Sequence, residues 1–385
     1  MPMSKHLVKF FPVDNGDTSL IKLKDNITLL IDVNIRESGT NTDGNDIYDV
    51  KKDLIESIEK NSGKYFLNYF ILTHPDEDHC LGFEKNFYQG DPEEYGESNN
   101  ENEEIIIDEL WVTPLLFSNG LCSDAKAIKK EANRRIKLID DEDSSKDSFG
   151  NKIRIIGYNA NDRYEDIPNY IPGEIAEISD YLELFIHAPF KKDLIESQAD
   201  KDRNASSIVF QARLKNKVTD DEPTAKLIFG GDADHYRWEK ILKISEENGN
   251  EDKLEWDIFL APHHCSWSFF NDVPYDDEEN QVAKDYSLDF LDYGQDGAKI
   301  IASCKKIKKE KPNPPHEAAK DEYIDKLDSK ENFINTSVHP KEKTPEPIVF
   351  EIGESIVKLE TQSEKKSRAA KEIAASGVVK KPWRV

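Results

Sequence analysis

The sequence predicts an α/β protein built as a layered sandwich of sheets and helices. Apolar runs of strand length occur in two blocks along the 385 residues, and segments with helical spacing lie among them. Polar loops that contain Asp and His follow three of the apolar runs, which is typical of a site at the carboxyl ends of strands. Hydrophobic residues make up 37% of the chain, so a large core can form although 34% of the residues are charged.

Apolar spacing and turn residues assign both blocks element by element. In the first block, a helix over 53–60 begins at Asp53 as its N-cap and precedes a buried strand over 65–72. The other expected strands are 7–13, 19–23, 27–33, 105–114, 153–158, 181–188, 206–214, 225–232, 256–262, 299–304, 347–352 and 355–360, and the other expected helices are 123–139, 235–247 and 317–328.

Polar segments and a basic end determine the expected domain organisation. We expect one domain over 1–362, with acidic surface insertions at about 87–105, 140–151 and 271–280. Residues 363–385 carry seven Lys or Arg and two Glu, so we expect a basic flexible tail there. The insertions and the tail are the candidate surfaces for a protein partner.

The charge of the chain restricts its partners and its location. The net charge is -25, and -30 for residues 1–362, which repels long nucleic-acid duplexes and anionic membranes. No apolar segment resembles a signal peptide or reaches membrane-spanning length, so we expect a cytoplasmic protein without a membrane partner. The four cysteines lie far apart without a CxxC motif, which argues against a disulfide scaffold and a zinc ribbon.

The loop after the strand 65–72 carries the strongest chemical signal. It offers four potential metal ligands within six residues: His74, Asp76, Asp78 and His79. Imidazole nitrogen and carboxylate oxygen suit zinc or a harder divalent ion such as manganese. The first two residues can face one ion while the last two turn toward a second. For this loop alone, a solvated turn with helix-capping Asp residues is the simpler alternative.

Two later strand ends carry residues of the same kind. Phe229–Asp232 ends one apolar run in GGD, and Pro262–Ser266 ends another in HHCS. A single Asp or His at a strand end usually caps a helix or packs in the core. Three such strand ends in this order are much harder to obtain by chance, and they favour one site built from all three.

Further motif matches extend along the chain. They lie at Val13–Asp17, Leu30–Asp32, Gly82, Asn204, Ser206, Ser207 and Asn313–His316. With the three strand ends, this order of motifs resembles the metallo-β-lactamase fold superfamily over roughly residues 5–360. More closely, it is similar to the hydrolase domain of competence DNA-uptake channel proteins (ComEC-like). The resemblance implies a four-layer αββα sandwich and a two-metal hydrolase site.

The resemblance also implies a role for each matching residue. The implied metal ligands are His74 and Asp76 for one ion, Asp78, His79 and His263 for the other, and Asp232 as the bridge. Asp78 would orient the nucleophilic water and His264 would handle a proton, so both are expected to be catalytic. The implied substrate-binding residues are Asn204, Ser266, Asn313 and His316. Asp76 replaces the usual His of the family and favours harder ions, and Asn204 lies near the place of another family His.

Two classes of function follow from these residues. The first is a metal-dependent hydrolase, most simply a phosphodiesterase or nuclease, with two divalent ions, zinc or manganese. Because the chain is so acidic, this enzyme would favour a short, single-stranded or small nucleotide substrate. The second is a non-catalytic regulatory or protein-binding member of the fold. Among enzymes, a thioester, ester or lactam hydrolase is the alternative.

Overall fold

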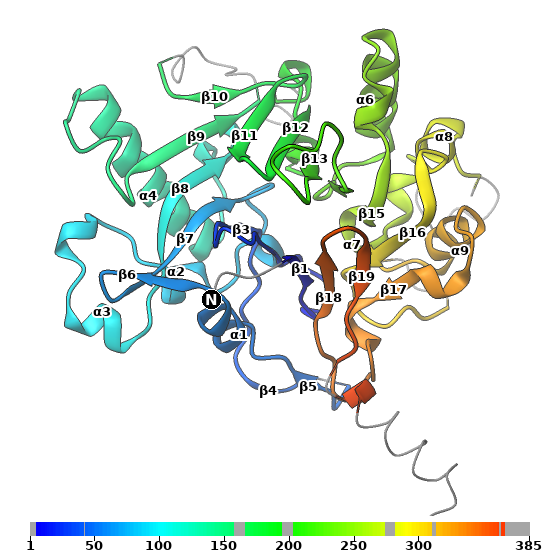
Figure 1. The fold of residues 1–385 in the computed structure, drawn as a ribbon, viewed down its shortest axis with the longest axis horizontal. Coiled ribbons are helices and arrows are strands. Elements are labelled where there is room, and N and C mark those ends of the chain that lie inside the picture. Colours follow the sequence, from blue (N-terminus) through cyan, green and yellow to red (C-terminus); the bar gives the residue numbers. More distant parts are fainter. Residues whose placement is uncertain are drawn as a thin grey trace, which may run out of the picture.

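Two β-sheets, each with helices along one side, form most of the structure (Figure 1). The computed structural model describes residues 5–41, 43–157, 166–194, 203–273, 282–309, 313–361 and 363–365. In order across the first sheet, the strands are β10 (Asn169–Tyr170), β9 (Lys152–Ile156), β8 (Ile106–Val112), β7 (Lys64–Ile71), β3 (Thr28–Ile31), β2 (Ser19–Lys22), β1 (His6–Phe10), β18 (Ile348–Ile352) and β19 (Ile356–Lys358), with β6 (Glu59–Asn61) beside β7.

The second sheet is formed by the middle of the chain. In order across it, the strands are β11 (Ile175–Ser179), β12 (Leu182–Ala188), β13 (Val209–Leu214), β14 (Ala225–Phe229), β15 (Trp256–Leu260), β16 (Gly294–Ala302) and β17 (Phe333–Asn335). A separate short pair joins β4 (Gly39–Thr40) and β5 (Asp46–Ile47). Because β18 pairs with β1, the last strands of the chain return to the first sheet.

The helices divide between the two sheets. Those beside the first sheet are α1 (Val50–Ser57), α2 (Phe83–Asn86) and α4 (Ser123–Asp140), and those beside the second are α6 (His235–Glu247), α8 (Asp285–Leu291) and α9 (Glu317–Asp325). Two short segments, α3 (Glu97–Glu101) and α7 (Pro262–Cys265), lie in loops. None of the helices in the described ranges combines the length and the apolar composition needed to cross a membrane.

Three apolar cores hold these layers together. Between the sheets, Val8 and Ile71 of the first sheet belong to the same buried cluster as Phe210 and Leu227 of the second. A second cluster joins the first sheet to its helices, and a third joins the second sheet to α6, α8 and α9. Helix, sheet, sheet and helix therefore follow one another, and the predicted αββα sandwich is confirmed.

Parallel pairing brings the predicted motifs to one edge of this sandwich. In the first sheet β3 and β7 are parallel, with Ile31 opposite Ile71. In the second sheet β14 and β15 are parallel, with Phe229 opposite Leu260. Because parallel strands end on the same side, the loops after them meet at that edge.

Several local expectations need correction. Helix α1 begins at Val50 and Asp49 is its N-cap, since the Asp49 side chain accepts a hydrogen bond from the Lys52 N–H. Asp53 instead accepts hydrogen bonds from Tyr48 and Lys9. The insertion 87–105 contains the 3₁₀ turn η2 (Pro92–Glu94) and α3, and it buries Tyr95. Among the described residues, six short strands were not expected: β4, β5, β6, β10, β11 and β17.

Two of the predicted polar segments fall largely outside the described residues. These are the third insertion, of which 274–280 lie outside the described residues, and the basic tail, of which 366–385 lie outside them. The insertion 140–151 follows α4 as a series of turns. The division into one domain over 1–362 and a tail stays a prediction.

Candidate metal centre

Asp232, three residues after the end of β14, lies at the centre of the Asp and His residues from the predicted motifs. Its Oδ1 is 3.1 Å from His79 Nε2 and 3.8 Å from His264 Nε2. Its Oδ2 is 3.5 Å from His74 Nε2 and 3.7 Å from His263 Nε2. Each oxygen of the carboxylate thus faces a different pair of imidazoles.

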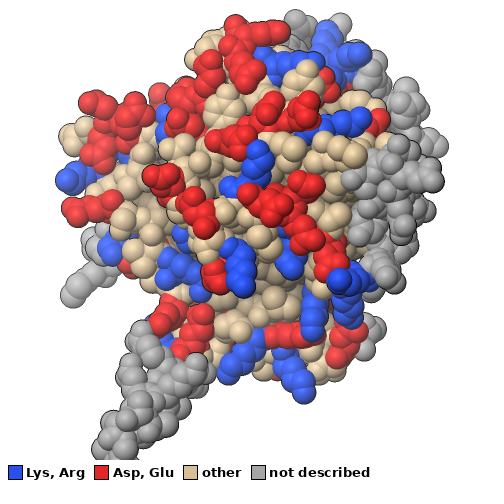
Figure 2. All heavy atoms as spheres, turned by 90° about the vertical axis from the view of Figure 1, so that its right-hand side faces the viewer, with Lys and Arg blue, Asp and Glu red and all other residues tan. Residues whose placement is uncertain are grey.

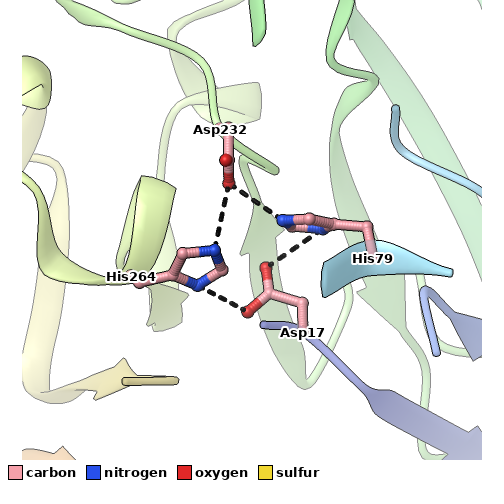
Figure 3. Close-up of side chains that lie close together, drawn as sticks. All are labelled: Asp17, His79, Asp232 and His264. Atoms are coloured by element: carbon pink, nitrogen blue, oxygen red, sulfur yellow. Dashed lines mark ion pairs between the residues drawn. The ribbon is translucent and has the colours of Figure 1, made fainter. Parts of the chain in front are cut away.

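The tightest group consists of Asp17, His79, Asp232 and His264. One ligand atom of each residue lies within 4.8 Å of the ligand atoms of the other three, and all four residues are buried. Figure 3 shows the four side chains pointing toward one common space. They come from four separate segments: the turn after β1, the 3₁₀ turn η1 (Glu77–His79), the end of β14 and the end of β15.

Several buried polar atoms around this space make no hydrogen bond among the described residues, although they lie within ion-pair distance of one another. They are Asp17 Oδ1, His74 Nε2, His79 Nε2, Asp232 Oδ1 and His264 Nε2. A buried polar group without a partner is costly, and several that face one space are satisfied together by a bound cation. Imidazole nitrogens and carboxylate oxygens are ligands of zinc and manganese. The residues present therefore fit a divalent metal.

Asp32, at the end of β3, orients the histidines of the first sheet. Its Oδ2 is 2.8 Å from His79 Nδ1, so His79 presents Nε2 to Asp232. The same carboxylate accepts hydrogen bonds from the Thr73 N–H at 2.7 Å and the Thr73 hydroxyl at 2.6 Å. The Thr73 hydroxyl is also 3.1 Å from His74 Nδ1. A carboxylate behind a metal-binding imidazole fixes its orientation and increases its basicity.

Asp76 and Asp78 lie at the rim of the centre rather than inside it. The Asp78 side chain is 40% exposed, and its Oδ2 is 3.1 Å from His264 Nε2. Asp76 Oδ1 accepts a hydrogen bond from Arg203 at 2.9 Å, while its Oδ2 is 3.9 Å from His74 Nε2. The carboxylate of Asp76, which stands where the family has a His, therefore contacts both His74 and the Arg203 guanidinium.

The segment after β15 turns two neighbouring imidazoles into the centre. His263, His264 and Cys265 have φ angles of 49°, 56° and 63°, a left-handed conformation that costs an L-residue about 1–2 kcal/mol. This turn places His263 beside Asp232 Oδ2 and His264 beside Asp232 Oδ1. Such strain persists at sites where the surrounding structure fixes the backbone.

The charges in the centre depend strongly on one another. Burial alone would lower the pKa of His264, but the carboxylates of Asp232, Asp78 and Asp17 outweigh it and raise that pKa to about 9. Burial raises the pKa of Asp17 to about 6, against the attraction of His79 and His264. Burial also opposes ionisation of Asp232, yet the four nearby histidines hold its pKa well below the usual range. A divalent cation would supply the positive charge that the imidazoles otherwise gain as protons.

The four residues expected to bind substrate have different environments. Ser266 is buried, and its hydroxyl accepts a hydrogen bond from the Ser268 N–H. His316 is also buried, and its Nδ1 accepts one from the Trp267 N–H at 2.8 Å. Both residues support the loop after His264. Asn204 is half-buried and Asn313 is exposed. A role in substrate binding stays a prediction for all four.

The sequence did not predict roles for Asp17, Asp32 and Arg203. Asp17 and Asp32 matched family motifs, but nothing in their spacing distinguished a ligand or an orienting carboxylate from a turn residue. Arg203 lies one residue before a matched Asn and carried no signal of its own. The apolar runs before Asp17 and Asp32 were the available clue, because both residues follow strands that end at the same edge.

Comparisons with known proteins give only distant similarity. No protein-family model matches the chain, and no curated protein matches it. Among solved structures, the chain is similar to isothiocyanate hydrolase from Delia radicum gut bacteria, with 11% identity over 90% of this chain and 100% of that one, and a TM-score of 0.41. It is also similar to a long form of RNase Z from yeast, with 10% identity over 78% of this chain and 37% of that one, and a TM-score of 0.33. The closer resemblance to competence DNA-uptake channel hydrolase domains stays a prediction.

Proposed function

We propose that the protein is a metal-dependent hydrolase that cleaves phosphodiester bonds, with two divalent cations held around Asp232. The observation that carries this proposal is the division of the Asp232 carboxylate between two pairs of imidazoles. A carboxylate that offers one oxygen to each of two ligand groups suits a bridging role. The histidine nitrogens without hydrogen-bond partners in the described part of the chain support the same assignment.

The proposed ligand sets differ from the expected ones in His263, His264 and Asp17, and they place Asp76 and Asp78 at the rim. His74, His263 and Asp232 would hold one cation, with Asp76 at its rim. Asp17, His79, His264 and Asp232 would hold the other, with Asp78 at its rim. His264 thus acts as a ligand rather than as a free proton-transfer group, and His263 belongs with His74.

The chain's own residues suggest how an anionic substrate is handled. Two divalent cations, zinc or manganese, would lower the pKa of a water molecule and offset charge on the attacked group. Asp78, whose side chain is 40% exposed at the rim, would accept a hydrogen bond from the attacking water and orient it. Arg203, whose side chain is 27% exposed beside Asp76, favours an anionic phosphodiester over a neutral ester. The net charge of -25 favours a short or single-stranded substrate.

The test combines metal content with turnover. The full chain is loaded with zinc or manganese, analysed for metal, and assayed with bis-p-nitrophenyl phosphate, a single-stranded oligonucleotide and a thioester. Asp232→Asn is expected to lose both bound cations and all turnover. The matched control is Asp234→Asn, two residues away, because Asp234 caps α6 and Asn is an equally good N-cap. This control is expected to keep metal and activity.

Three outcomes would contradict parts of the proposal. Bound metal without turnover of any substrate would favour the non-catalytic alternative, and faster thioester cleavage would favour the alternative chemistry. His264→Ala tests the ligand assignment. As a ligand, its loss removes about one cation per chain. If it only transfers a proton, metal content stays and the rate falls by roughly 10²-fold.

A further inference from the structure

Two free cysteines meet beside the candidate metal centre. Cys80 directly follows His79, and its Sγ is 3.5 Å from the Sγ of Cys122. Cys122 is the N-cap of α4, where its sulfur accepts a hydrogen bond from the Ala125 N–H at 3.4 Å. We propose that these two residues are a modification site, which hydrogen peroxide converts into a disulfide that distorts the loop carrying His79.

The two sulfurs differ in their accessibility, which assigns their order of reaction. Cys122 is half-buried, whereas Cys80 is completely buried. The hydrogen bond from Cys80 and the backbone N–H of Ala125 lower the pKa of Cys122 to about 7 against the effect of burial. A thiolate at the start of an 18-residue helix is also stabilised by the helix dipole. Cys122 therefore reacts with the peroxide and Cys80 resolves the product.

The chemistry balances with hydrogen peroxide as the oxidant. The Cys122 thiolate attacks one peroxide oxygen, so an S–O bond forms, the O–O bond breaks and hydroxide leaves. This gives a sulfenic acid at Cys122. The Cys80 sulfur then attacks the Cys122 sulfur, the S–O bond breaks, and the departing hydroxide takes the thiol proton as water. In total, two thiols lose two electrons and peroxide becomes two molecules of water.

Closing this bond must move the residue next to His79. A disulfide joins its sulfurs at about 2.05 Å, so the two atoms approach by about 1.5 Å from their present separation. The Cys80 thiol shares its single proton between the Cys122 sulfur and the Asp76 carbonyl oxygen, which is 3.1 Å away, and oxidation removes both hydrogen bonds. Both changes act on η1, which holds His79 against Asp232. The expected loss of metal affinity rests on the proposed function, but disulfide formation does not.

The other two cysteines provide an internal reference. Cys265 and Cys304 are completely buried. Burial raises the pKa values of Cys265 and Cys304 well above the usual value of a thiol, so both thiols stay protonated. They are expected to remain reduced under conditions that oxidise the pair.

The experiment treats the full chain, free of metal in the presence of a chelator, with hydrogen peroxide. The protein is then unfolded, alkylated and mapped by mass spectrometry. The expected result is one cross-linked peptide pair joining Cys80 to Cys122, with Cys265 and Cys304 alkylated. In Cys80→Ala, Cys122 should instead be trapped as a sulfenic acid by dimedone, and in Cys122→Ser, Cys80 should stay reduced. Oxidation of Cys122 to sulfinic acid without a cross-link in the wild type would overturn the proposal.

A second measurement tests the effect on the centre. Zinc and manganese affinities are compared for the reduced and the peroxide-treated chain by competition with a chelator. At least tenfold weaker binding after oxidation, reversed by dithiothreitol and absent in Cys122→Ser, is expected. Equal affinities would overturn the coupling while leaving the mapped disulfide intact. Neither measurement uses turnover, so failure of the proposed hydrolase activity would remain distinguishable.

Discussion

Asp32 shows how one residue organises the centre without facing it. Its carboxylate receives hydrogen bonds from Thr73 and contacts His79 Nδ1, so the loop backbone and an imidazole depend on the same two oxygens. Asp32 itself lies at the end of β3 with a φ of 53°, and its side chain contacts Thr73 and His79 in the loop after β7. The strained backbone of Asp32 therefore accompanies the contact that orients His79.

Removing the charge of Asp32 should weaken metal binding without unfolding the chain. We expect Asp32→Asn to lower zinc or manganese affinity by about 10- to 100-fold, because the amide no longer holds and polarises His79. Chelator competition measures the affinity. Asp25→Asn, an exposed turn residue after β2, is the control. Equal affinities in both variants would show that Asp32 only stabilises the loop.

His187 gives a prediction on pH and stability away from the centre. It is 3% exposed, its Nε2 is 2.9 Å from the Lys253 carbonyl, and burial lowers its pKa to about 4. Its unfolded pKa is about 6.5, so as pH falls below that value the unfolded state binds the proton first. The stability from neutral His187 is complete above pH 6.5 and is lost as pH falls toward 4, by about 2 kcal/mol between pH 7 and pH 5.

Urea unfolding of the wild type and His187→Gln at both pH values measures this effect. Gln keeps a donor for the Lys253 carbonyl but does not titrate. The variant should therefore lose less stability than the wild type between pH 7 and pH 5. An equal loss of stability in both proteins would show that protonation of His187 does not cause the pH dependence.

At the scale of elements, sequence patterns predicted where the centre lies better than which residues form it. Apolar runs that end in Asp or His predicted the ends of β7, β14 and β15, because buried strands and the polar loops after them have contrasting compositions. The turn after β1 contains two aspartates, and composition cannot separate them. Asp17 enters the centre, whereas Asp14 pairs with Arg36. The left-handed turn at His263 could not be foreseen either, since such φ angles are rare outside Gly and Asn.

The turn after β1 also makes a prediction about Gly16. A Cβ there would lie 2.1 Å from Asn34 Nδ2 and 2.6 Å from the Asp78 carbonyl oxygen, at a φ of 136°. Gly16→Ala should therefore displace Asp17 and Asp78 together, lower metal content and destabilise the fold by about 1–3 kcal/mol. Gly39→Ala separates steric overlap from backbone strain. Gly39 also has a positive φ, 152°, but no atom among the described residues lies within 4 Å of the added Cβ. Equal effects in both variants would assign the cost to φ alone.

At the scale of the whole molecule, the net charge opposes the anionic substrate that we propose for the centre. Figure 2 shows acidic and basic side chains interspersed over the face that carries α8 and α9. The chain nevertheless sums to -25, so a polyanion meets net repulsion on approach. Composition predicted the net negative charge. It could not predict that Arg203 lies at the rim, because the contact between Arg203 and Asp76 joins two loops that are distant in the sequence.

Ionic strength should separate the approach of substrate from its cleavage. Raising salt shortens the Debye length from about 30 Å at 0.01 M to about 8 Å at 0.15 M, which screens the repulsion of an oligonucleotide more than that of a singly charged diester. As the salt concentration increases, we therefore expect kcat/KM for a single-stranded oligonucleotide to rise relative to kcat/KM for bis-p-nitrophenyl phosphate. A falling ratio would indicate that a basic surface attracts the longer substrate.

The residues around Asp232 come from both sheets, and this has a consequence for the cooperativity of unfolding. Asp17, His74 and His79 follow strands of the first sheet, whereas Asp232, His263 and His264 follow strands of the second. A cation held by both groups binds only when the sheets are docked, so its binding free energy opposes every fluctuation that separates them. Amide hydrogen exchange in β7 and β14 should then slow together on metal loading, while exchange in the peripheral α3 stays unchanged. The bound ion would therefore make the two sheets unfold in a single cooperative transition.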